Sequence, residues 1–408
     1  MGDLSTDSSQ LLQANARRAA RPIVTTRAFS ASMDRGLVSS LFYTDFGPRQ
    51  GFRSLGLMRY RTVNSMGQRR ALLIGTPFFG YYQHIIAGLV ERGFTVDYYN
   101  DRPTENPVVK GAIRVRPGLV NGRVIRYLDE IVASTSGRNY DLVLTINGKI
   151  HTPDFVARLR ARHPHAEFVF YLWDAVSLYP HTLDFLHLMD RCYTFDRADA
   201  ERYPQLGLLP LFYIPPYGTI GAATPPPATY DLASICTAHA NRYAVLKPLV
   251  PQLEAAGLRV FDYRYLHPLR FVYERTRAHG PLHKATTREF TFRSLAPERV
   301  HHVVKHSVGV LDINHEAQTG LTMRTIETVG ARRKLVTTNA ESRRYTFFDP
   351  SRVLVIDSFD ANVPEIVDFL HAPMEPLPTD VYATYSMSHW LDVLTGKESA
   401  ADAQVFLR

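Results

Sequence analysis

The sequence predicts two α/β domains in series, each a doubly wound parallel sheet with helices on both faces. From residue 70 onward, short apolar runs typical of buried strands alternate with longer amphipathic stretches typical of helices. The alternation stops at residues 221–229, which include three consecutive prolines, and then starts again. At 408 residues, the chain is long enough for two or three domains of ordinary size.

The first domain, residues 70–220, is expected to begin with a strand, a loop and a helix that Gly93 ends. A later helix has Thr152 in position to cap it and Pro153 at its first turn. Short turns between these strands and helices indicate βαβ units, which place strands in parallel. The predicted strands are ALLIGT (71–76), FTVDYYN (94–100), YDLVLTING (140–148) and EFVFYLWD (167–174), and the predicted helices are QHIIAGLVERG (83–93), GRVIRYLDEIVAS (122–134) and TPDFVARLRARHP (152–164).

After the Pro-rich linker at 221–229, the second domain, residues 230–375, repeats the same alternation. Its first helix is expected to end at Gly257. The predicted strands are DLASICT (231–237), LRVFDYRY (258–265), SVGVLDIN (307–314), KLVTTN (334–339) and RVLVIDS (352–358), and the predicted helices are YAVLKPLVPQLEAAG (243–257), APERVHHVVKHS (296–307) and GLTMRTIETVG (320–330).

Composition describes a folded protein whose core size is not limiting. Hydrophobic residues make up 45% of the chain and charged residues 21%, and no apolar run approaches the length of a membrane span. The two cysteines, Cys192 and Cys236, are far apart and form no ligand-like cluster. The sequence therefore excludes the disordered, membrane-spanning and disulfide-rich classes.

The net charge of +8 is concentrated at the start of the chain. Residues 1–70 hold 11 Arg, no Lys and 4 Asp, a charge of +7, so the remainder carries only +1. Because the folded body is nearly neutral, no nucleic-acid partner is expected. We expect residues 1–69 to form a basic, largely flexible leader, which either is simply solvated or makes a peripheral contact with anionic membrane.

The leader also contains two weak targeting patterns. MGDLST fits the myristoylation pattern, and ARRAARPIVTTRAFSAS is Arg- and Ser-rich like an organelle transit peptide, although Asp3 and Asp7 weaken the second reading. No apolar segment precedes a cleavage site. We therefore expect a cytoplasmic protein, with peripheral contact at the inner face of the membrane as an extension of that location.

Polar and glycine-rich loops directly follow the predicted strands. Ligands of open parallel sheets bind outside the carboxyl ends of the strands, where such loops lie. Ordinary turn chemistry is the alternative explanation for Gly, Pro and Asn at these positions. The loops are GTPFFGYY, INGKIHTP, LWDAVS, CTAHANRY and NHEAQTGLTMR.

The stretch QTGLTMRTIE, residues 318–327, carries the most informative pattern. Gly320 before a helix lets the backbone approach a ligand, and the free N–H groups of a helix start favour an anion. Arg324 suits phosphate oxygens, and Glu327 one turn later suits ribose hydroxyls. The alternative is an exposed i,i+3 ion pair between Arg324 and Glu327.

The run HSVGVLDINHEAQTGLTMRTIETVGARRKLVTTN resembles the donor-binding half of GT-B glycosyltransferases, particularly the CgeB-like group and related bacterial polysaccharide-assembly enzymes. The shared pattern is a strand, a Gly-Leu-x-x-Arg-x-x-Glu helix start and a strand ending in Thr-Asn. The resemblance covers roughly residues 70–395 and is strongest at 298–358. It implies two Rossmann-like domains facing across a cleft, with the nucleotide sugar held by the second domain and the acceptor by the first.

The resemblance also implies roles for individual residues. It places Gly320 and Leu321 nearest the phosphates, Arg324 on the diphosphate and Glu327 on the ribose. The departure from the family is the missing E-x7-E spacing, so the stereochemical outcome stays open. Further donor-side candidates in the CTAHANRY loop are His239, Asn241 and Arg242, and acceptor-side candidates are Asp174 as base with Asn147. Independently of the resemblance, Phe79 and Tyr81 are acceptor-side candidates for a sugar-stacking platform; aromatic caps of the core are the alternative.

The remaining patterns argue against a cofactor or metal. GTPFFG has neither the dinucleotide-binding spacing nor a Walker lysine, and no D-x-D triplet occurs. The histidines of APERVHHVVKH lack a nearby Cys or acidic cluster, so solvated side chains are expected there. Arg side chains and a helix start would then take the place of a metal ion at the leaving phosphate.

These observations lead to one leading hypothesis and one alternative. The leading hypothesis is a metal-independent glycosyltransferase that moves a sugar from a nucleotide-sugar donor to a hydroxyl of a glycan or glycolipid, including a lipid-linked glycan. The alternative is a catalytically inactive GT-B-like protein that binds sugar nucleotides or acts as a scaffold. The resemblance further implies that residues 376–408 return toward the first domain, with a terminal helix at 379–396 whose apolar stripe is Tyr382, Met387, Trp390, Leu391 and Leu394.

Overall fold

The computed structural model divides the chain into two units, residues 1–54 and residues 55–408. All described residues belong to the second unit, so the expectation of a flexible leader lies almost wholly outside them. The described residues are 58–60, 69–78, 80–103, 121–276, 280–314, 319–357, 362–398 and 405–408.

The first sheet has seven strands in the order β1-β3-β2-β4-β5-β6-β7. All neighbouring strands from β3 to β7 pair in parallel, and β1 pairs antiparallel with β3 at the edge. β1 comes from the segment that the sequence assigned to the leader, so the sheet includes residues before 70. The strands are β1 (Met58–Tyr60), β2 (Arg69–Ile74), β3 (Phe94–Tyr99), β4 (Leu142–Ile146), β5 (Glu167–Leu172), β6 (Arg191–Thr194) and β7 (Gly207–Leu208).

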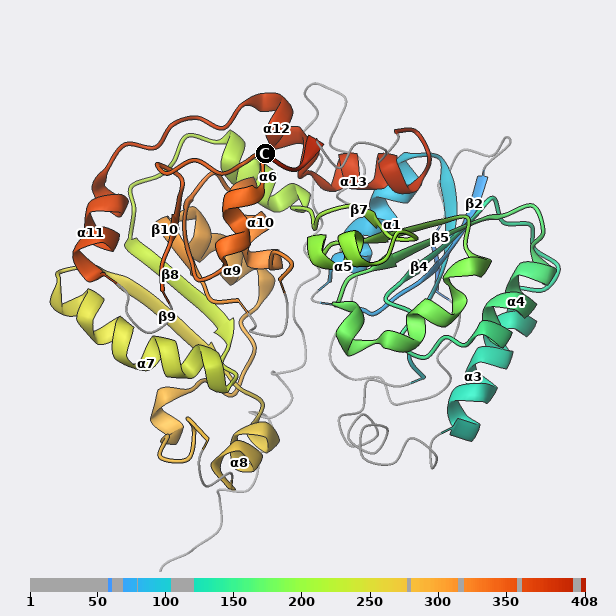
Figure 1. Cartoon of the computed structure of the whole chain (residues 1–408), viewed down its shortest axis with the longest axis horizontal. Coiled ribbons are helices and arrows are strands. Elements are labelled where there is room, and N and C mark those ends of the chain that lie inside the picture. Colours follow the sequence, from blue (N-terminus) through green and yellow to red (C-terminus); the bar gives the residue numbers. More distant parts are fainter. Residues whose placement is uncertain are drawn as a thin grey trace, which may run out of the picture. The chain divides into compact units, whose positions relative to one another are not determined.

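Both faces of the first sheet are covered, as the continuous apolar strands require. Alternate residues of β2 face opposite sides: Leu73 packs in one buried cluster, and Leu72 packs in the other. Helices α3 and α4 pack together, as do α1 and α13 (Figure 1). The helices between the strands of this sheet are α1 (Tyr81–Glu91), α3 (Asn121–Ser134), α4 (Pro153–Arg162) and α5 (Arg197–Arg202), followed by α6 (Pro215–Ala222).

The predicted helix signals of this domain are confirmed. Thr152 caps α4 by accepting a hydrogen bond from the Phe155 N–H at 3.2 Å, and Pro153 is the first helical residue. Gly93 follows α1 with a φ of +84°, a conformation that favours glycine. The sequence did not reveal β6, β7 or the 3₁₀ helices Val176–Leu178 and Pro180–Leu188, because they lack a clear apolar period.

The second sheet has five strands, all parallel, in the order β12-β11-β10-β8-β9. Helices α7 and α11 lie on one side of it, and α9 and α10 lie on the other (Figure 1). No helix or strand occupies residues 223–229, where the linker was predicted. The elements are β8 (Tyr230–Thr237), α7 (Ala240–Ala255), β9 (Val260–Tyr265), α8 (Pro268–Thr276), α9 (Pro297–Lys305), β10 (Ser307–Asp312), α10 (Met323–Gly330), β11 (Lys334–Thr337), β12 (Val353–Val355) and α11 (Val363–His371).

The predicted terminal helix at 379–396 is wrong as a single element, because it is two helices. α12 (Thr379–Thr384) and α13 (Met387–Leu394) are separated where the backbone of Tyr213 bonds to Tyr385 O and Met387 N. The side chain of Ser386 then caps α13 by accepting from the His389 N–H at 3.1 Å.

Helix α13 packs against elements of the first sheet domain. Trp390 on α13 is buried, with its ring 4.3 Å from that of Phe212 and 4.9 Å from that of Tyr171. Asp392 pairs with Arg92 at the end of α1 at 2.9 Å. Among the described residues, no helix is both long enough and apolar enough to cross a membrane.

Candidate functional site

The helix that carries the Arg324 and Glu327 motif begins later than the sequence suggested. α10 starts at Met323, with Thr322 as its cap, rather than at Gly320. Thr322 accepts from the Thr325 N–H at 3.1 Å, which a glycine has no side chain to do. The Asp312 carboxylate at the end of β10 accepts from the Thr322 hydroxyl at 2.6 Å and the Thr325 hydroxyl at 2.7 Å. The strand thus fixes the first turn of the helix.

Gly320 lies in close contact with protein atoms. Its N–H donates to Asp196 Oδ2 at 2.8 Å, and its carbonyl accepts from Asn339 Nδ2 at 3.2 Å. A Cβ on Gly320 would lie 2.3 Å from a ring carbon of Phe195. Its neighbour Leu321 is buried in the hydrophobic core. Packing against Phe195 therefore explains the glycine without a ligand.

Arg324 and Glu327 form an ion pair, with 2.7 Å between Nη1 and Oε2. The pair is not the exposed one of the alternative interpretation, because the side chains are only 18% and 8% exposed. The Tyr81 hydroxyl, from the start of α1, donates to Glu327 Oε1, so Glu327 has protein partners on both oxygens. Arg324 Nε is buried without an acceptor among the described residues.

The surroundings keep Arg324 charged and the two neighbouring tyrosines protonated. Burial, followed by the Glu327 charge, raises the pKa of Tyr81 well above its ordinary value. Burial and Glu327 likewise raise the pKa of Tyr217, whose hydroxyl lies 3.5 Å from Arg324 Nη1. Burial alone would lower the pKa of Arg324, but Glu327 and Tyr217 raise it above its usual range.

The CTAHANRY loop brings its three candidates to the start of α7. His239 is exposed at the cap position, and the Asn241 amide oxygen is buried with no partner among the described residues. Arg242 Nε donates to Ile313 O at 2.8 Å, next to the end of β10. Arg242 also approaches Thr237 O at 3.4 Å, so it connects the carboxyl ends of β8 and β10.

On the first sheet, Asp174 follows β5 and pairs with Lys149, which follows β4. The Lys149 Nζ to Asp174 Oδ2 distance is 3.0 Å, and the side chains are 15% and 29% exposed respectively. Burial alone would lower the pKa of Lys149, but Asp174 and Tyr179 raise it above its usual value. Asp174 is thus the more exposed member of this pair.

Asn147 connects the ends of the same two strands. It is buried, it adopts a φ of +70°, and its Oδ1 accepts from the Trp173 N–H at 2.9 Å. Asn tolerates this left-handed conformation better than most residues. Its side chain therefore positions the β5 loop that carries Asp174.

Asp101, directly after β3, is a carboxylate that the sequence reasoning missed. It is fully buried, and its Oδ1 accepts from the Thr76 hydroxyl at 3.0 Å. Its Oδ2 has no hydrogen-bond partner among the described residues. Burial raises the pKa of Asp101, while Lys149 and Arg102 oppose the rise. Its place after a strand, like that of Asp174, is the signal that could have found it.

An aromatic group joins the two sets of candidates. The Tyr81 ring lies 5.9 Å from Trp173, 6.1 Å from Phe212 and 6.5 Å from Phe78. Tyr81 was predicted on the acceptor side, and its hydroxyl is engaged by Glu327 from the second sheet domain. Phe79, the other aromatic candidate, lies outside the described residues.

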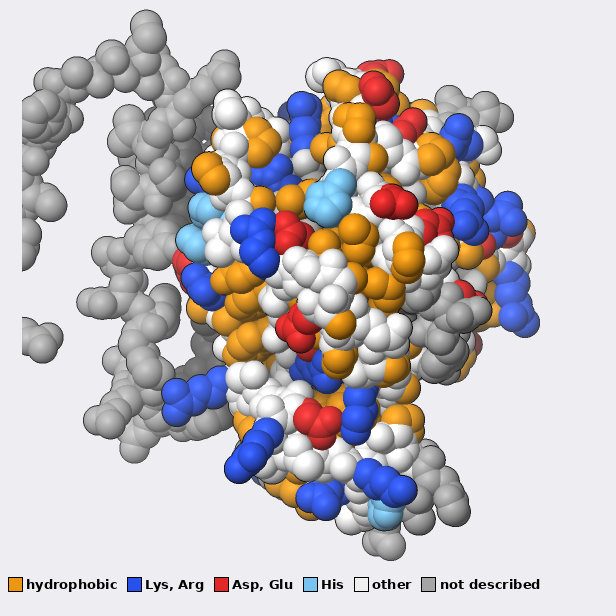
Figure 2. Space-filling model, turned by 90° about the vertical axis from the view of Figure 1, so that its left-hand side faces the viewer, with side chains coloured by type: hydrophobic (Ala, Val, Ile, Leu, Met, Phe, Trp, Pro, Cys, Tyr) orange, Lys and Arg blue, Asp and Glu red, His pale blue; other side chains and the backbone are white. Residues whose placement is uncertain are grey.

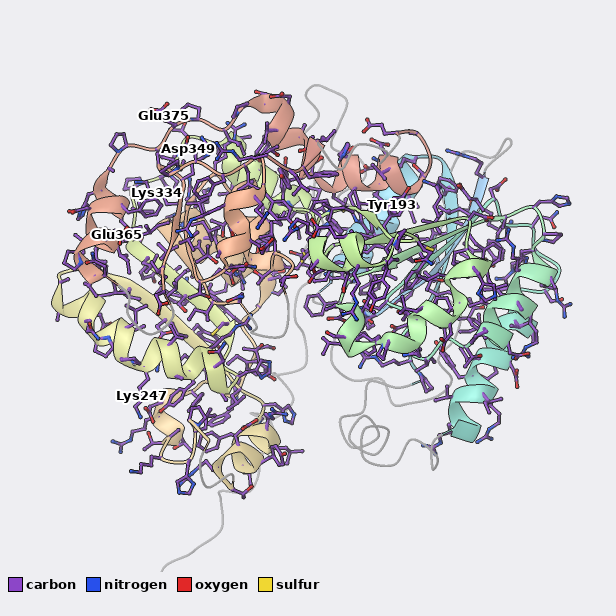
Figure 3. The ribbon with its side chains drawn as sticks, viewed as in Figure 1. Tyr193, Lys247, Lys334, Asp349, Glu365 and Glu375 are labelled. Atoms are coloured by element: carbon purple, nitrogen blue, oxygen red, sulfur yellow. The ribbon has the colours of Figure 1, made fainter. Side chains whose placement is uncertain are left out.

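A cavity of about 810 Å³ lies elsewhere, near the amino ends of β5 and β6 and beside Tyr193 (Figure 3). Its cations already have partners. Arg191 donates to Glu167 and to two carbonyls of α13, and Arg197 pairs with Glu341 at 2.8 Å. Within the described ranges, no group of three or more His, Cys, Asp or Glu side chains is arranged to hold a metal ion. We therefore place the candidate site at the carboxyl ends of the strands and not in this cavity.

Comparison with known proteins finds no matching family model and no matching curated protein. Solved structures do match. A sucrose-phosphate synthase from Thermosynechococcus elongatus is 12% identical, with a TM-score of 0.52 over 82% of this chain and 100% of that chain. OtsA in its apo form is 12% identical, with a TM-score of 0.51 over 80% and 98% of the two chains.

A third match is an alpha-glucosyltransferase in complex with UDP and a 13-mer DNA. It is 8% identical, with a TM-score of 0.51 over 80% of this chain and all of that chain. At these identities, the similarity concerns the fold. The two parallel-sheet α/β domains of this chain have the GT-B fold.

Proposed function

We propose that the chain is a glycosyltransferase that moves a sugar from a nucleotide-sugar donor to a hydroxyl of a glycan or glycolipid, without a metal ion. The observation that carries this proposal is the Arg324 and Glu327 pair in the first turns of α10. The pair follows β10 at its carboxyl end, where open α/β sheets bind ligands. The GT-B fold supports the assignment to sugar transfer, and one fold also hosts other activities.

On the donor side, Arg324 would bind the diphosphate and Glu327 the ribose. The buried Arg324 Nε, which lacks an acceptor among the described residues, suits a phosphate oxygen. The N-terminus of α10 adds a partial positive charge that favours the same anion. A ribose hydroxyl on Glu327 would replace the Tyr81 hydroxyl that now donates there. Arg324 and the start of α10 would stabilise the negative charge that develops on the leaving phosphate.

On the acceptor side, Asp174 would accept the proton of the attacking hydroxyl. Its partly exposed carboxylate follows β5, and Lys149 holds one of its oxygens at 3.0 Å. Asn147 and Trp173 fix the backbone of that loop. The two tasks of deprotonation and leaving-group stabilisation then fall to different sheet domains.

The finer assignment follows the sequence resemblance. We assign the chain to the CgeB-like group of bacterial polysaccharide-assembly enzymes, acting in the cytoplasm or peripherally at the inner face of the membrane. One structural neighbour was solved with DNA. We do not propose nucleic acid as a partner of this chain, because the chain after residue 70 carries a net charge of only +1.

A panel of nucleotides and nucleotide sugars tests the proposal. Thermal unfolding with UDP, GDP, CMP and dTDP should identify one base, because a ligand at 100 times its dissociation constant stabilises by about 2.7 kcal/mol. The matching nucleotide sugars should then be hydrolysed slowly without acceptor. Binding without any hydrolysis or transfer would favour the inactive binder, and no binding to any nucleotide would contradict both readings.

A further inference from the structure

Helix α8 turns a set of large apolar side chains toward solvent. Leu269, Val272 and Tyr273 are 64%, 61% and 55% exposed. Their spacing places them on one face of the helix. Of the seven exposed large hydrophobic side chains in the described part of the chain, these three lie together, and Leu269 and Val272 are the most exposed. We call Leu269, Val272 and Tyr273 the apolar trio.

The opposite face of α8 is firmly anchored, so the exposure does not come from a loose helix. Phe271 is buried, with its ring 5.4 Å from that of Phe290 and 5.5 Å from that of Phe292. Glu274 is also buried and pairs with Arg270 one turn earlier. These contacts hold the helix in one orientation, with the apolar trio outward.

The surface around the trio is basic. Residues 266–293 contain six Lys or Arg and two Glu, a net charge of +4. Both carboxylates are engaged: Glu274 pairs with Arg270, and Glu289 pairs at 3.2 Å with Lys247, which lies near the middle of α7 and is labelled in Figure 3. The exposed cations among the described residues of this segment are Arg275, Lys284, Arg288 and Arg293.

Cations of residues 266–293 lie next to the apolar trio. The Arg270 guanidinium is 5.4 Å from the centre of the Tyr273 ring. His283 Nδ1 lies 3.1 Å from Arg275 O, which places the segment containing Lys284 at the carboxyl end of α8. In the space-filling view, Lys and Arg side chains spread over the lower part of the face, at the level of α8 (Figure 2).

We propose that this face of α8 docks on an anionic lipid membrane. An interfacial helix places apolar side chains at the boundary between headgroups and acyl chains, while its cations contact anionic headgroups. Nucleic acid would satisfy the cations but would leave the trio in water. A stable protein interface covers about 800 Å² per partner, far more than three side chains supply. Lipid therefore fits both the size and the charge of the patch.

Sedimentation of the full chain with vesicles tests the docking surface. Wild type should sediment with vesicles of phosphatidylglycerol and phosphatidylcholine, and not with phosphatidylcholine alone. Replacing the trio by Leu269→Ser, Val272→Ser and Tyr273→Ser should weaken binding at least about tenfold. Ile125→Ser removes an equally exposed apolar side chain from α3 and should leave binding unchanged.

Further variants test the charge of the contact and its depth in the membrane separately. Lys284→Glu and Arg288→Glu should each weaken binding by about five-fold, and added salt should weaken it further. Tyr273→Trp should give an emission blue shift and quenching by brominated lipid, whereas Ile125→Trp should give neither. Both native tryptophans, Trp173 and Trp390, remain as a constant background.

Two results would overturn the proposal. One is equal vesicle binding by wild type and the trio variant, which would place membrane contact on another surface such as the leader. The other is a wild type that self-associates in sedimentation velocity, binds no vesicles and becomes monomeric in the trio variant. That outcome would make the trio an interface between copies of the chain.

Discussion

Two ion pairs lie at the carboxyl ends of the two sheets, and they differ in how the protein encloses them. Arg324 and Glu327 are 2.7 Å apart and mostly buried, and Glu327 also accepts from Tyr81. Lys149 and Asp174 are 3.0 Å apart, with the Asp174 side chain 29% exposed. An enclosed pair depends on every partner, whereas an open pair contributes little to stability and leaves its carboxylate accessible. The Arg324 and Glu327 pair should therefore stay intact until a ligand replaces one of its partners. The Asp174 carboxylate, in contrast, is already accessible to a ligand.

Breaking the enclosed pair should have the largest effect on stability. Glu327→Ala leaves Arg324 buried without its counter-charge and leaves the Tyr81 hydroxyl without an acceptor. Losing one partner of a buried pair costs about 3–5 kcal/mol, which urea unfolding would measure. Asp129→Ala breaks an exposed pair with Arg158 and should cost less than about 1 kcal/mol. Equal losses in the two variants would contradict the difference in enclosure.

Filling the space beside Gly320 should have the second largest effect on stability. A Cβ at Gly320 would meet the Phe195 ring at 2.3 Å, so Gly320→Ala should destabilise by about 3 kcal/mol, the upper end for overpacking. Gly122 on α3 has no atom within 4 Å of the corresponding Cβ. Gly122→Ala should leave the free energy of unfolding unchanged or raise it, because Ala favours helix. A stable Gly320→Ala variant would mean that Phe195 moves easily.

Acid should destabilise the fold through His151, a buried histidine two residues after Lys149. Burial lowers the pKa of His151 to about 3, and both ring nitrogens lack partners among the described residues. The unfolded chain binds this proton below about pH 6.5, and the folded chain does not until about pH 3. Stability is thus full above pH 6.5 and falls by about 2 kcal/mol at pH 5.

Replacing this histidine measures its share of the acid effect. His151→Leu should remove about 2 kcal/mol of the stability difference between pH 7 and pH 5. His187→Leu, which removes an exposed histidine from the neighbouring 3₁₀ helix, is the matched control. An unchanged pH dependence in His151→Leu would show that other groups carry the acid sensitivity.

The open pair should matter least for stability and most for turnover. Lys149→Met should lower the free energy of unfolding by less than Glu327→Ala does, because Asp174 remains partly solvated. In the proposed reaction, Asp174→Asn should lower kcat, with the KM for the donor unchanged. A kinetic assay with a hydroxyl acceptor measures both. Full kcat in Asp174→Asn would direct attention to Asp101, another carboxylate at these strand ends.

The sequence predicts the local elements well, because their signals lie within a few residues. The alternation of strands and helices and the Thr152 cap each depend on neighbours along the chain. The start of α10 was placed too early because its cap depends on Asp312, ten residues before Thr322. The break between α12 and α13 was missed because it pairs with Tyr213, far away in sequence.

The candidate site shows the same limit more strongly. The motif places Arg324 and Glu327 together, since they share one helix. Nothing near them indicates that Tyr81 donates to Glu327, because the two are 246 residues apart. Likewise, the sequence motif alone predicts that Gly320 faces a ligand, whereas the structure places Phe195 and Asp196 beside it. Long-range contacts decide which motif residues are open to a ligand.

Nucleotide affinity in two variants tests the central claim most directly. If a nucleotide-sugar donor binds at Arg324 and Glu327, Arg324→Ala should weaken binding of the preferred nucleoside diphosphate by about ten- to a hundred-fold, the loss of a charged hydrogen bond. Tyr81→Phe removes the hydroxyl that competes for Glu327, so it should tighten binding. Calorimetric titration of the two variants beside wild type measures both changes. Unchanged affinity in both well-folded variants would contradict the claim and place the nucleotide elsewhere.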